Sequence, residues 1–453
     1  MEILRKLSLV IFVAFLFFFK SVLCSCKIEV KNLVTKGAVE PLFLSKSLNP
    51  EKYYFNIPRN GFITVENGED LYSFCRQTKG KPPVLTRSNC INDKFDPPIN
   101  TVCPQDQAPI AKFYNSRSCG QNLEGRIFEI GYELIAPDKD NNKIVHFMPL
   151  TTVCHNKYLE STFYSQHVLY KGNMGKSMKT FGTEYWDSSG YDENTADNVK
   201  KYYNDTNEKA FFKKINLNTD DRLSKGHLNP NGDQPFQSWK KATYFYLNQV
   251  PQWQVFNQNP WENIEFNVKK QSDKADLIVF TGGHGQFKIG ARDVFMSNIT
   301  GPDDTVLRIQ VPKLIWKLFF NVETRHCLAF VIMNYNFGSD AFEKRDPEMC
   351  SDRDDECKNL DDKRLKNNIN NVNAGFLSCC SYKELIKMIK YELNHEGAPL
   401  KCLTSDEIHK SENDILAAPF SVGFSAFTYS FSKTKGKNKL IYQKFLLNLR
   451  VQQ

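Results

Sequence analysis

Residues 225–265 decide how this chain is interpreted, and they read KGHLNPNGDQPFQSWKKATYFYLNQVPQWQVFNQNPWENIE. His227 follows Lys225 and Gly226, so a cation lies two residues from an imidazole, and the glycine permits a close backbone approach. A neighbouring positive charge lowers the pKa of a histidine and keeps the ring neutral, as a general base requires. Taken alone the tripeptide is weak evidence, since a single histidine is more often structural than catalytic.

The residues after His227 predict two helices. The first is expected to run from Asp233 to Val250, because its apolar residues recur at three- and four-residue spacing. The second is expected to begin at Asn259 and Pro260, which are typical of a helix cap and of the first helical position, and to carry Glu265.

Two asparagines, Asn248 and Asn257, lie at the ends of these predicted helices, and Glu265 lies two turns into the second. Amide and carboxylate oxygens suit a hard ion such as Mg²⁺, which keeps most of its waters and needs few protein ligands. The alternative for each residue singly is structural: the asparagines as caps or turn residues, and Glu265 as a solvated helix charge.

This stretch resembles the DNA/RNA non-specific endonucleases, whose signature is (R/K)GH followed by an N…PQ…N…W…E pattern. The matching residues are Lys225-Gly226-His227, Asn248, Pro251-Gln252, Asn257, Trp261 and Glu265. Val311–Leu318 (VPKLIWKL) resembles the strand that follows the metal-binding helix of this family, and the later cysteines resemble its secreted eukaryotic branch that degrades double-stranded RNA. The resemblance covers residues from about 130 to about 400.

The resemblance implies an α+β fold with a ββα-metal (His-Me finger) nuclease core. It implies His227 as the general base, Asn257 as the direct ligand of Mg²⁺ (with Mn²⁺ as the alternative ion), and Glu265 as the holder of metal-bound waters. Asn248 would support the base or the substrate phosphate. Lys225 would stabilise the phosphate as it becomes five-coordinate.

Two features depart from the family pattern. Many members carry Arg at the position of Lys225, and a lysine offers a point charge where an arginine offers a bidentate fork. The second, upstream arginine of the family is expected within Cys154–His167, and this segment contains Lys157 but no arginine. Both departures concern the rate more than the class of reaction.

Composition sets broader limits. The chain has 453 residues, of which 41% are hydrophobic and 24% charged, close to ordinary globular usage, which excludes a disordered or fibrous protein. Its formal net charge of +8 permits a polyanionic partner without requiring one.

The N-terminus is typical of a signal peptide. Arg5 and Lys6 precede an apolar run, Leu7–Phe19, too short to span a membrane, and Ser25 is the expected mature start. Secretion, with no membrane segment, is therefore predicted for residues 25–453. The sequons at Asn204 and Asn298 are expected on exposed loops.

The cysteines support this prediction. Removing Cys24 from the 13 leaves six between Cys26 and Cys154 and six between Cys327 and Cys402. An even number in two separate groups predicts disulfides formed within each group in an oxidising compartment.

Strand-like segments complete the organisation. The N-terminal ones are Lys27–Val30, Tyr53–Ile57 and Phe62–Val65, and the later ones are 126–135, 162–169, 277–281, 306–311, 314–321 and 328–334. Gly282-Gly283-His284-Gly285 is interpreted as a hairpin turn. The expected division is a signal peptide at 1–24, a Cys-rich β-type accessory region at 25–130 and an endonuclease domain at 131–453.

The functional expectation is a secreted, magnesium-dependent endonuclease acting on DNA and RNA, including double-stranded RNA. Two alternatives stay open: a nucleic-acid-binding secreted glycoprotein with weak or lost catalysis, and a nucleotide phosphodiesterase on the same core. The sequence leaves the oligomeric state undetermined.

Overall fold

The computed structural model describes residues 25–33, 39–48, 51–77, 81–105, 108–137, 143–173, 186–214, 221–299, 308–335, 346–350, 365, 375–395 and 398–403. The predicted signal peptide, residues 1–24, lies outside this set. All described residues belong to one compact unit, Met1–Ile408. None of their helices combines the length and the apolar character needed to cross a membrane.

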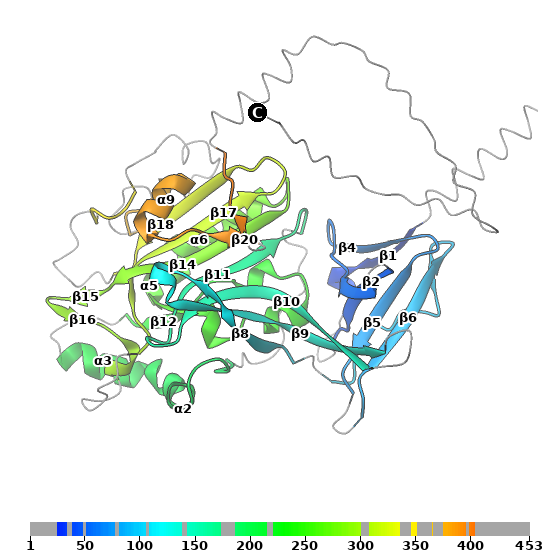
Figure 1. The fold of residues 1–453 in the computed structure, drawn as a ribbon, viewed down its shortest axis with the longest axis horizontal. Coiled ribbons are helices and arrows are strands. Elements are labelled where there is room, and N and C mark those ends of the chain that lie inside the picture. Colours follow the sequence, from blue (N-terminus) through cyan, green and yellow to red (C-terminus); the bar gives the residue numbers. More distant parts are fainter. Residues whose placement is uncertain are drawn as a thin grey trace, which may run out of the picture. The chain divides into compact units, whose positions relative to one another are not determined.

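The centre of the fold is an antiparallel sheet of eight strands in the order β19-β18-β17-β14-β11-β10-β9-β8 (Figure 1). Its strands are β8 (Ile110–Cys119), β9 (Gly125–Pro137), β10 (Lys143–Asn156), β11 (Ser161–Leu169), β14 (Leu277–Gln286), β17 (Pro312–Asn321), β18 (Cys327–Met333) and β19 (Ser378–Cys380). Strand β18, CLAFVIM, is buried at every position, as a continuous apolar run predicts. The strands predicted at 126–135, 162–169, 314–321 and 328–334 are confirmed with small shifts at their ends.

The glycine-rich stretch Gly282–Gly285 lies inside β14, so its interpretation as a hairpin turn is wrong. Gly282 pairs with Trp316 and Gly283 with Ile315 of β17. A Cβ atom on Gly282 would overlap the backbone oxygen of Phe163 and would lie 2.6 Å from the Trp316 side chain. A glycine is therefore required here, because the neighbouring strands β11 and β17 approach this strand closely.

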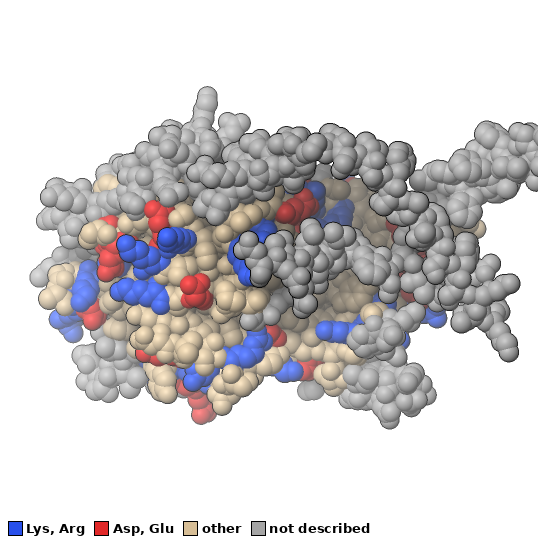
Figure 2. Space-filling view, turned by 45° about the horizontal axis from the view of Figure 1, so that its top comes forward, with Lys and Arg blue, Asp and Glu red and all other residues tan. Residues whose placement is uncertain are grey.

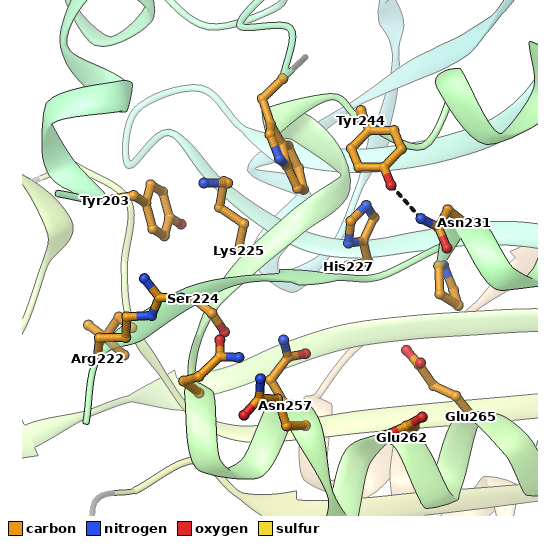
Figure 3. A pocket seen from close by; sticks show the side chains of 15 residues that line it. Tyr203, Arg222, Ser224, Lys225, His227, Asn231, Tyr244, Asn257, Glu262 and Glu265 are labelled. Carbon is orange, nitrogen blue, oxygen red and sulfur yellow. Dashed lines mark hydrogen bonds between the residues drawn. The ribbon is translucent and has the colours of Figure 1, made fainter. Parts of the chain in front are cut away.

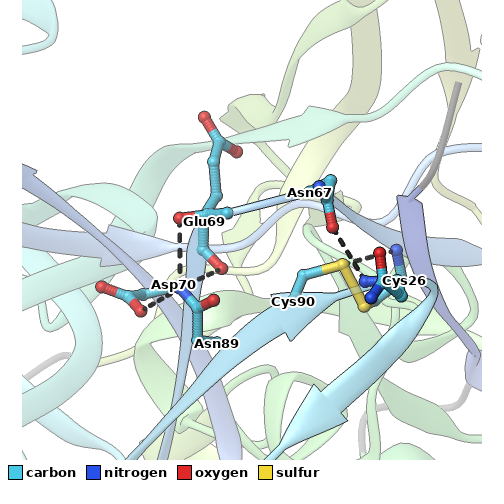
Figure 4. The surroundings of a disulfide bond; sticks show 8 residues. Cys26, Asn67, Glu69, Asp70, Asn89 and Cys90 are labelled. Atoms are coloured by element: carbon cyan, nitrogen blue, oxygen red, sulfur yellow. Dashed lines mark hydrogen bonds between the residues drawn. A yellow bond between two sulfur atoms is a disulfide. The ribbon is translucent and has the colours of Figure 1, made fainter. Parts of the chain in front are cut away.

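Residues before β8 form a Cys-rich β region, as predicted. A five-stranded sheet has the order β3-β2-β5-β6-β7, and β1 pairs with β4. The strands are β1 (Ser25–Glu29), β2 (Leu42–Leu48), β3 (Glu51–Phe55), β4 (Phe62–Glu66), β5 (Asp70–Cys75), β6 (Val84–Ile91) and β7 (Lys94–Asp96). The Cys26–Cys90 disulfide joins β1 to β6, and the nearby Asn89 amide donates to the backbone oxygens of Gly68 and Glu69 (Figure 4).

This β region is tied to the rest of the unit by packing and by charge. The Phe55 and Trp239 rings have centroids 4.9 Å apart, and the guanidinium of Arg59 forms an ion pair with Asp276. Residue 130, the predicted domain boundary, lies inside β9, and the eight-stranded sheet already begins at Ile110. The division into two domains stays a prediction.

Five disulfides connect described cysteines, and each joins two members of the same group. They are Cys26–Cys90, Cys75–Cys103, Cys119–Cys154, Cys327–Cys402 and Cys350–Cys380. Cys379 is also disulfide-bonded. For these five bonds, pairing within each group is confirmed.

The helix predicted between Asp233 and Val250 is wrong. Only helix α4 (Gln237–Lys241) forms there, a 3-10 turn follows at Tyr246–Asn248, and strand β13 (Gln249–Trp253) begins directly afterwards. The apolar residues at helical spacing are buried for another reason. Phe236 and Trp239 pack into the core shared with the N-terminal region, whereas Tyr246 and Val250 pack into the core of the main sheet.

The second predicted helix is confirmed as α6 (Pro260–Gln271), with Asn259 before it and Pro260 in its first turn. Strand β12 (Leu223–His227) pairs with β13, and α5 (Gln254–Gln258) and α6 follow, so a β-hairpin leads into helices as in a ββα unit. The described part of the chain also contains the helices α2 (Glu193–Tyr202), α3 (Asp205–Lys214) and α9 (Tyr382–Ile389) and the short strands β15 (Lys288–Ile289), β16 (Arg292–Asp293), β20 (Asn394–His395) and β21 (Ala398–Pro399).

Candidate active site

Strand β12 presents Lys225 and His227 on the same side, because residues two apart in a strand share a face. The hairpin register sets Lys225 opposite Pro251 and His227 opposite Gln249. A Cβ atom on Gly226 would lie 2.6 Å from Oε1 of Gln252. The glycine therefore lets β13 pack closely against β12 between the two functional side chains.

These side chains open into a cleft of about 520 Å³ (Figure 3). Its walls are formed by Trp186, Tyr203, Arg222, Leu223, Ser224, Lys225, His227, Pro230, Asn231, Tyr244, Gln254, Asn257, Gln258, Glu262 and Glu265. Four of the five predicted site residues, Lys225, His227, Asn257 and Glu265, meet there, and Asn248 does not.

The imidazole of His227 is packed between aromatic rings. Its centroid lies 4.7 Å from that of Trp186 and 5.1 Å from that of Tyr244. Burial, followed by the charge of Lys225, lowers the pKa of His227 to about 4. Its Nε2 atom is buried and has no hydrogen-bond partner within the described part of the chain. A neutral ring with an unpaired nitrogen can accept a proton from a group that enters the cleft.

Asn257 and Glu265 face β12 from the helices on the other side of the cleft (Figure 3). Burial raises the pKa of Glu265 to about 7; the ammonium of Lys317 opposes this rise and the carboxylate of Asp233 adds to it. A nearby cation would favour the ionised form of such a carboxylate.

The donor set at this position suits a hard divalent cation that keeps much of its water. Asn257 offers an amide oxygen and Glu265 a carboxylate. Among the described residues no cluster of three or more His, Cys, Asp or Glu side chains could enclose a metal ion. An ion held here would therefore depend on few protein ligands, which is the usual pattern for Mg²⁺.

A buried lysine lies beneath the cleft. Lys317 of β17 is 1% exposed, and its Nζ donates to Oγ1 of Thr281 at 2.7 Å and approaches the backbone oxygen of Leu228 at 3.4 Å. The same nitrogen lies 5.5 Å from the centroid of the Trp261 ring. Burial lowers the pKa of Lys317, and the carboxylates of Glu265 and Asp233 counteract this. Lys317 therefore compensates two acidic groups at the floor of the site.

Asp233 belongs to this floor and does not cap a helix. Its Oδ2 atom lies 3.0 Å from Nε2 of His167 on β11, and burial lowers the pKa of that histidine. The contact with Asp233 and the position on β11 give His167 a structural role.

Asn248 lies next to the loop that follows His227 and strand β12. Its Oδ1 accepts hydrogen bonds from Ser165 Oγ and the Asn229 backbone N–H, both at 3.0 Å. Its Nδ2 donates to the backbone oxygens of Asn229 and Thr243, both at 2.9 Å. Because the amide is fully engaged and buried, its geometry favours holding the loop after His227 over contacting a substrate.

Several cleft residues were not singled out from the sequence. Arg222 lies three residues before Lys225, so a search for further cations next to the Lys225-Gly226-His227 motif could have found it. Trp186 and Tyr203 come from a polar stretch about twenty to forty residues upstream, which no local pattern connects to the site.

One cleft is bordered by a histidine on a β-hairpin and by an amide and a carboxylate on the helices that follow. This arrangement defines the class of ββα-type phosphodiester hydrolases. Residues 134–381, more than half of the chain, match the family of DNA/RNA non-specific endonucleases, and the protein belongs to that family. It is therefore a nuclease of a family that depends on divalent metal ions.

The chain is similar along most of its length to curated relatives. It is 24% identical to a salivary endonuclease of Lutzomyia longipalpis, over 86% of this chain and 90% of the relative. It is 24% identical to a salivary endonuclease of Culex quinquefasciatus (80% and 88%) and 22% identical to salivary protein Tsal2A of Glossina morsitans morsitans (81% and 91%). A crystal structure of EndoG with EndoGI aligns over 42% of this chain and 74% of that chain at 15% identity, with a TM-score of 0.27.

Replacing the buried lysine tests the floor of the site. Lys317→Met should lower the free energy of unfolding by about 1–3 kcal/mol, because it removes the buried hydrogen bond to Thr281 and a buried charge that opposes those of Glu265 and Asp233. Lys313→Met is the matched control on the same strand, since Lys313 pairs with Asp346 and Glu348 at a partly exposed position and should cost less than about 1 kcal/mol. Urea unfolding measures both, and equal losses would contradict the assignment.

The lowered pKa of His227 predicts a pH dependence of stability. Between its ordinary value of 6.5 and about 4, the unfolded chain binds this proton more readily than the folded chain. The free energy of unfolding should therefore fall as the pH is lowered through this range, and it should fall less steeply in His227→Gln. Urea unfolding in the presence of EDTA checks this, and parallel profiles for the two proteins would refute the prediction.

Proposed function

We propose that this protein is a secreted, magnesium-dependent endonuclease that hydrolyses DNA and RNA, including double-stranded RNA, without sequence preference. The observation that carries the proposal is that Lys225, His227, Asn257 and Glu265 border one cleft in the order and spacing of the family signature. Membership of the endonuclease family supports the reaction class.

In this proposal His227 removes a proton from the attacking water. The neutral ring and its unpaired buried nitrogen suit that task. Asn257 would hold Mg²⁺ directly, and Glu265 would orient the water molecules around the ion. When bound, the ion supplies charge stabilisation for the phosphate and its leaving oxygen. Asn248 acts through position: its four hydrogen bonds keep the loop after His227 in place.

Two cations, Lys225 on β12 and Arg222 directly before that strand, provide contacts to phosphate. Lys225 and Arg222 both border the cleft, and Arg222 offers the second cation that the upstream segment lacks. Figure 2 shows Lys and Arg side chains in several separate groups, with Asp and Glu side chains among them, on the part of this face whose residues are described. Binding that depends on phosphate contacts carries no sequence information, which favours cleavage without sequence preference.

Secretion is supported by three observations. The predicted signal peptide precedes Ser25, disulfides connect both cysteine groups, and the relatives include salivary endonucleases. Asn204 of the first sequon is exposed at the start of α3, where a glycan could be attached.

The base and the metal ligand are separable by mutation. His227→Ala should lower turnover by a factor of about 10²–10⁴, the usual contribution of a positioned base, and should leave nucleic-acid binding in EDTA unchanged. Asn257→Ala should also lose turnover, but raised Mg²⁺ should recover part of it. Asn263→Ala, at a partly exposed amide in the same helix as Glu265, is the control and should behave as wild type.

Cleavage of plasmid, single-stranded RNA and double-stranded RNA, with an Mg²⁺ titration and an EDTA control, provides the measurement. A folded His227→Ala that cuts at the wild-type rate would remove His227 from the mechanism. A dinucleotide substrate cleaved in preference to the polymers would favour a nucleotide phosphodiesterase instead.

Substituting the cations proposed to bind phosphate should change kcat, KM and the salt dependence of binding, whereas substituting other surface cations should not. Lys225→Ala should lower kcat strongly, and Arg222→Gln should raise KM several-fold and reduce the salt dependence of binding by about one unit of slope. Arg292→Gln changes an exposed cation on β16 that does not border the cleft and should leave both parameters unchanged. If Arg222→Gln and Arg292→Gln give the same KM and salt slope, Arg222 is not a phosphate ligand.

A further inference from the structure

The ammonium of Lys225 lies between two aromatic rings. Its Nζ atom is 5.5 Å from the centroid of the Trp186 ring and 5.4 Å from that of the Tyr203 ring. Figure 3 shows Lys225 and Tyr203 on the same side of the cleft. Both distances are within about 6 Å, the range over which a cation is attracted to an aromatic face. A lysine side chain has a flexible four-carbon stem, so two rings that attract its charge restrict where that charge can lie.

The two rings are themselves held in place. Trp186 is 9% exposed, and its centroid lies 5.5 Å from that of Tyr244 and 5.4 Å from that of Tyr246. Tyr203 stacks on Tyr246 with centroids 6.1 Å apart, and its hydroxyl donates to Oε1 of Gln249 at 2.6 Å. The rings therefore form a wall that is already fixed when a substrate arrives.

This wall also borders the base. The Trp186 ring packs against His227 with centroids 4.7 Å apart, so one indole contacts both functional side chains of β12. The position of the Lys225 charge relative to the imidazole is consequently set by Trp186, and not by the backbone of β12 alone.

We propose that Trp186 and Tyr203 are positioning residues that form an aromatic cage for the ammonium of Lys225, and that this cage makes lysine the effective cation at a position where many members of the family carry arginine. The inference rests on the proposed role of Lys225 in binding phosphate. A compact ammonium can lie between two rings and still direct an N–H group into the cleft. A guanidinium is planar and longer, so it stacks on one ring and aims its donors along the ring plane.

The cage predicts that Tyr203 acts through Lys225. Tyr203→Leu should lower kcat on a labelled RNA duplex about ten-fold at saturating Mg²⁺, whereas Tyr203→Phe, which keeps the ring, should stay within about two-fold of wild type. In a Lys225→Met background, Tyr203→Leu should have little further effect, because the cation that it positions is gone. A ten-fold loss in that background as well would show a general structural role and would overturn the proposal.

The cage also predicts the effect of substituting the cation. If only the charge of Lys225 mattered, Lys225→Arg would keep the activity, whereas the cage predicts a loss. Lys225→Arg should lower kcat about ten-fold in this chain, although arginine is common at this position in the family. A Lys225→Arg variant as active as wild type, or more active, would show that the cage does not select lysine.

A measurement without catalysis tests the cage directly. In the full chain labelled with ¹³C-lysine, the ε-methylene signal that disappears in Lys225→Met should be shifted upfield by the two rings. It should move toward ordinary lysine values in Tyr203→Leu and stay shifted in Tyr203→Phe. An unshifted signal in the wild type would overturn the cage. A wild-type protein that cleaves no nucleic acid while showing the shifted signal would contradict the proposed function and leave the cage standing.

Discussion

The ammonium of Lys317 is the interaction on which the geometry of the cleft depends. It connects Thr281 of β14, the backbone oxygen of Leu228 directly after β12, and the Trp261 face of α6. These three points belong to the sheet, the hairpin and the helix, so one buried charge holds together the parts of the ββα unit. Its positive charge also offsets the repulsion between two carboxylates at the floor of the cleft, those of Glu265 and Asp233.

A second constraint fixes His227, the proposed base. The Asn248 side chain closes the loop after His227 through four hydrogen bonds to described groups, and the hairpin register then determines where the imidazole lies. Buried polar groups that are fully satisfied hold a unique arrangement, because any displacement leaves several of them unpaired at once. The Asn248 amide therefore affects the site without bordering the cleft, because it holds the loop that follows His227.

Parts of this arrangement could be predicted from the sequence because they are local. Asn259 and Pro260 predict the start of α6, and continuous apolar runs predict the buried strands. The spacing of His227, Asn257 and Glu265 could be read only through the family pattern. The helix predicted after Asp233 failed because its apolar residues are shared between two cores, and periodicity cannot distinguish that from one helix face. Lys317 and Trp186 reach the site through sheet pairing and packing, which leave no local pattern.

The charges across the cleft favour the proposed roles of a metal ion and of Lys225. Arg222 and Lys225 lie on the strand side, and Glu262 and Glu265 lie on the helix side (Figure 3). A phosphodiester that approaches the strand side meets cations, but its other oxygens would face carboxylates. We infer that a divalent ion held by Asn257 reverses the sign of the helix side, so that the phosphate lies between two positive walls. The ion acts on the helix side only. On the strand side the Lys225 charge depends on protein packing for its position, and the two aromatic rings near its ammonium contribute to that packing.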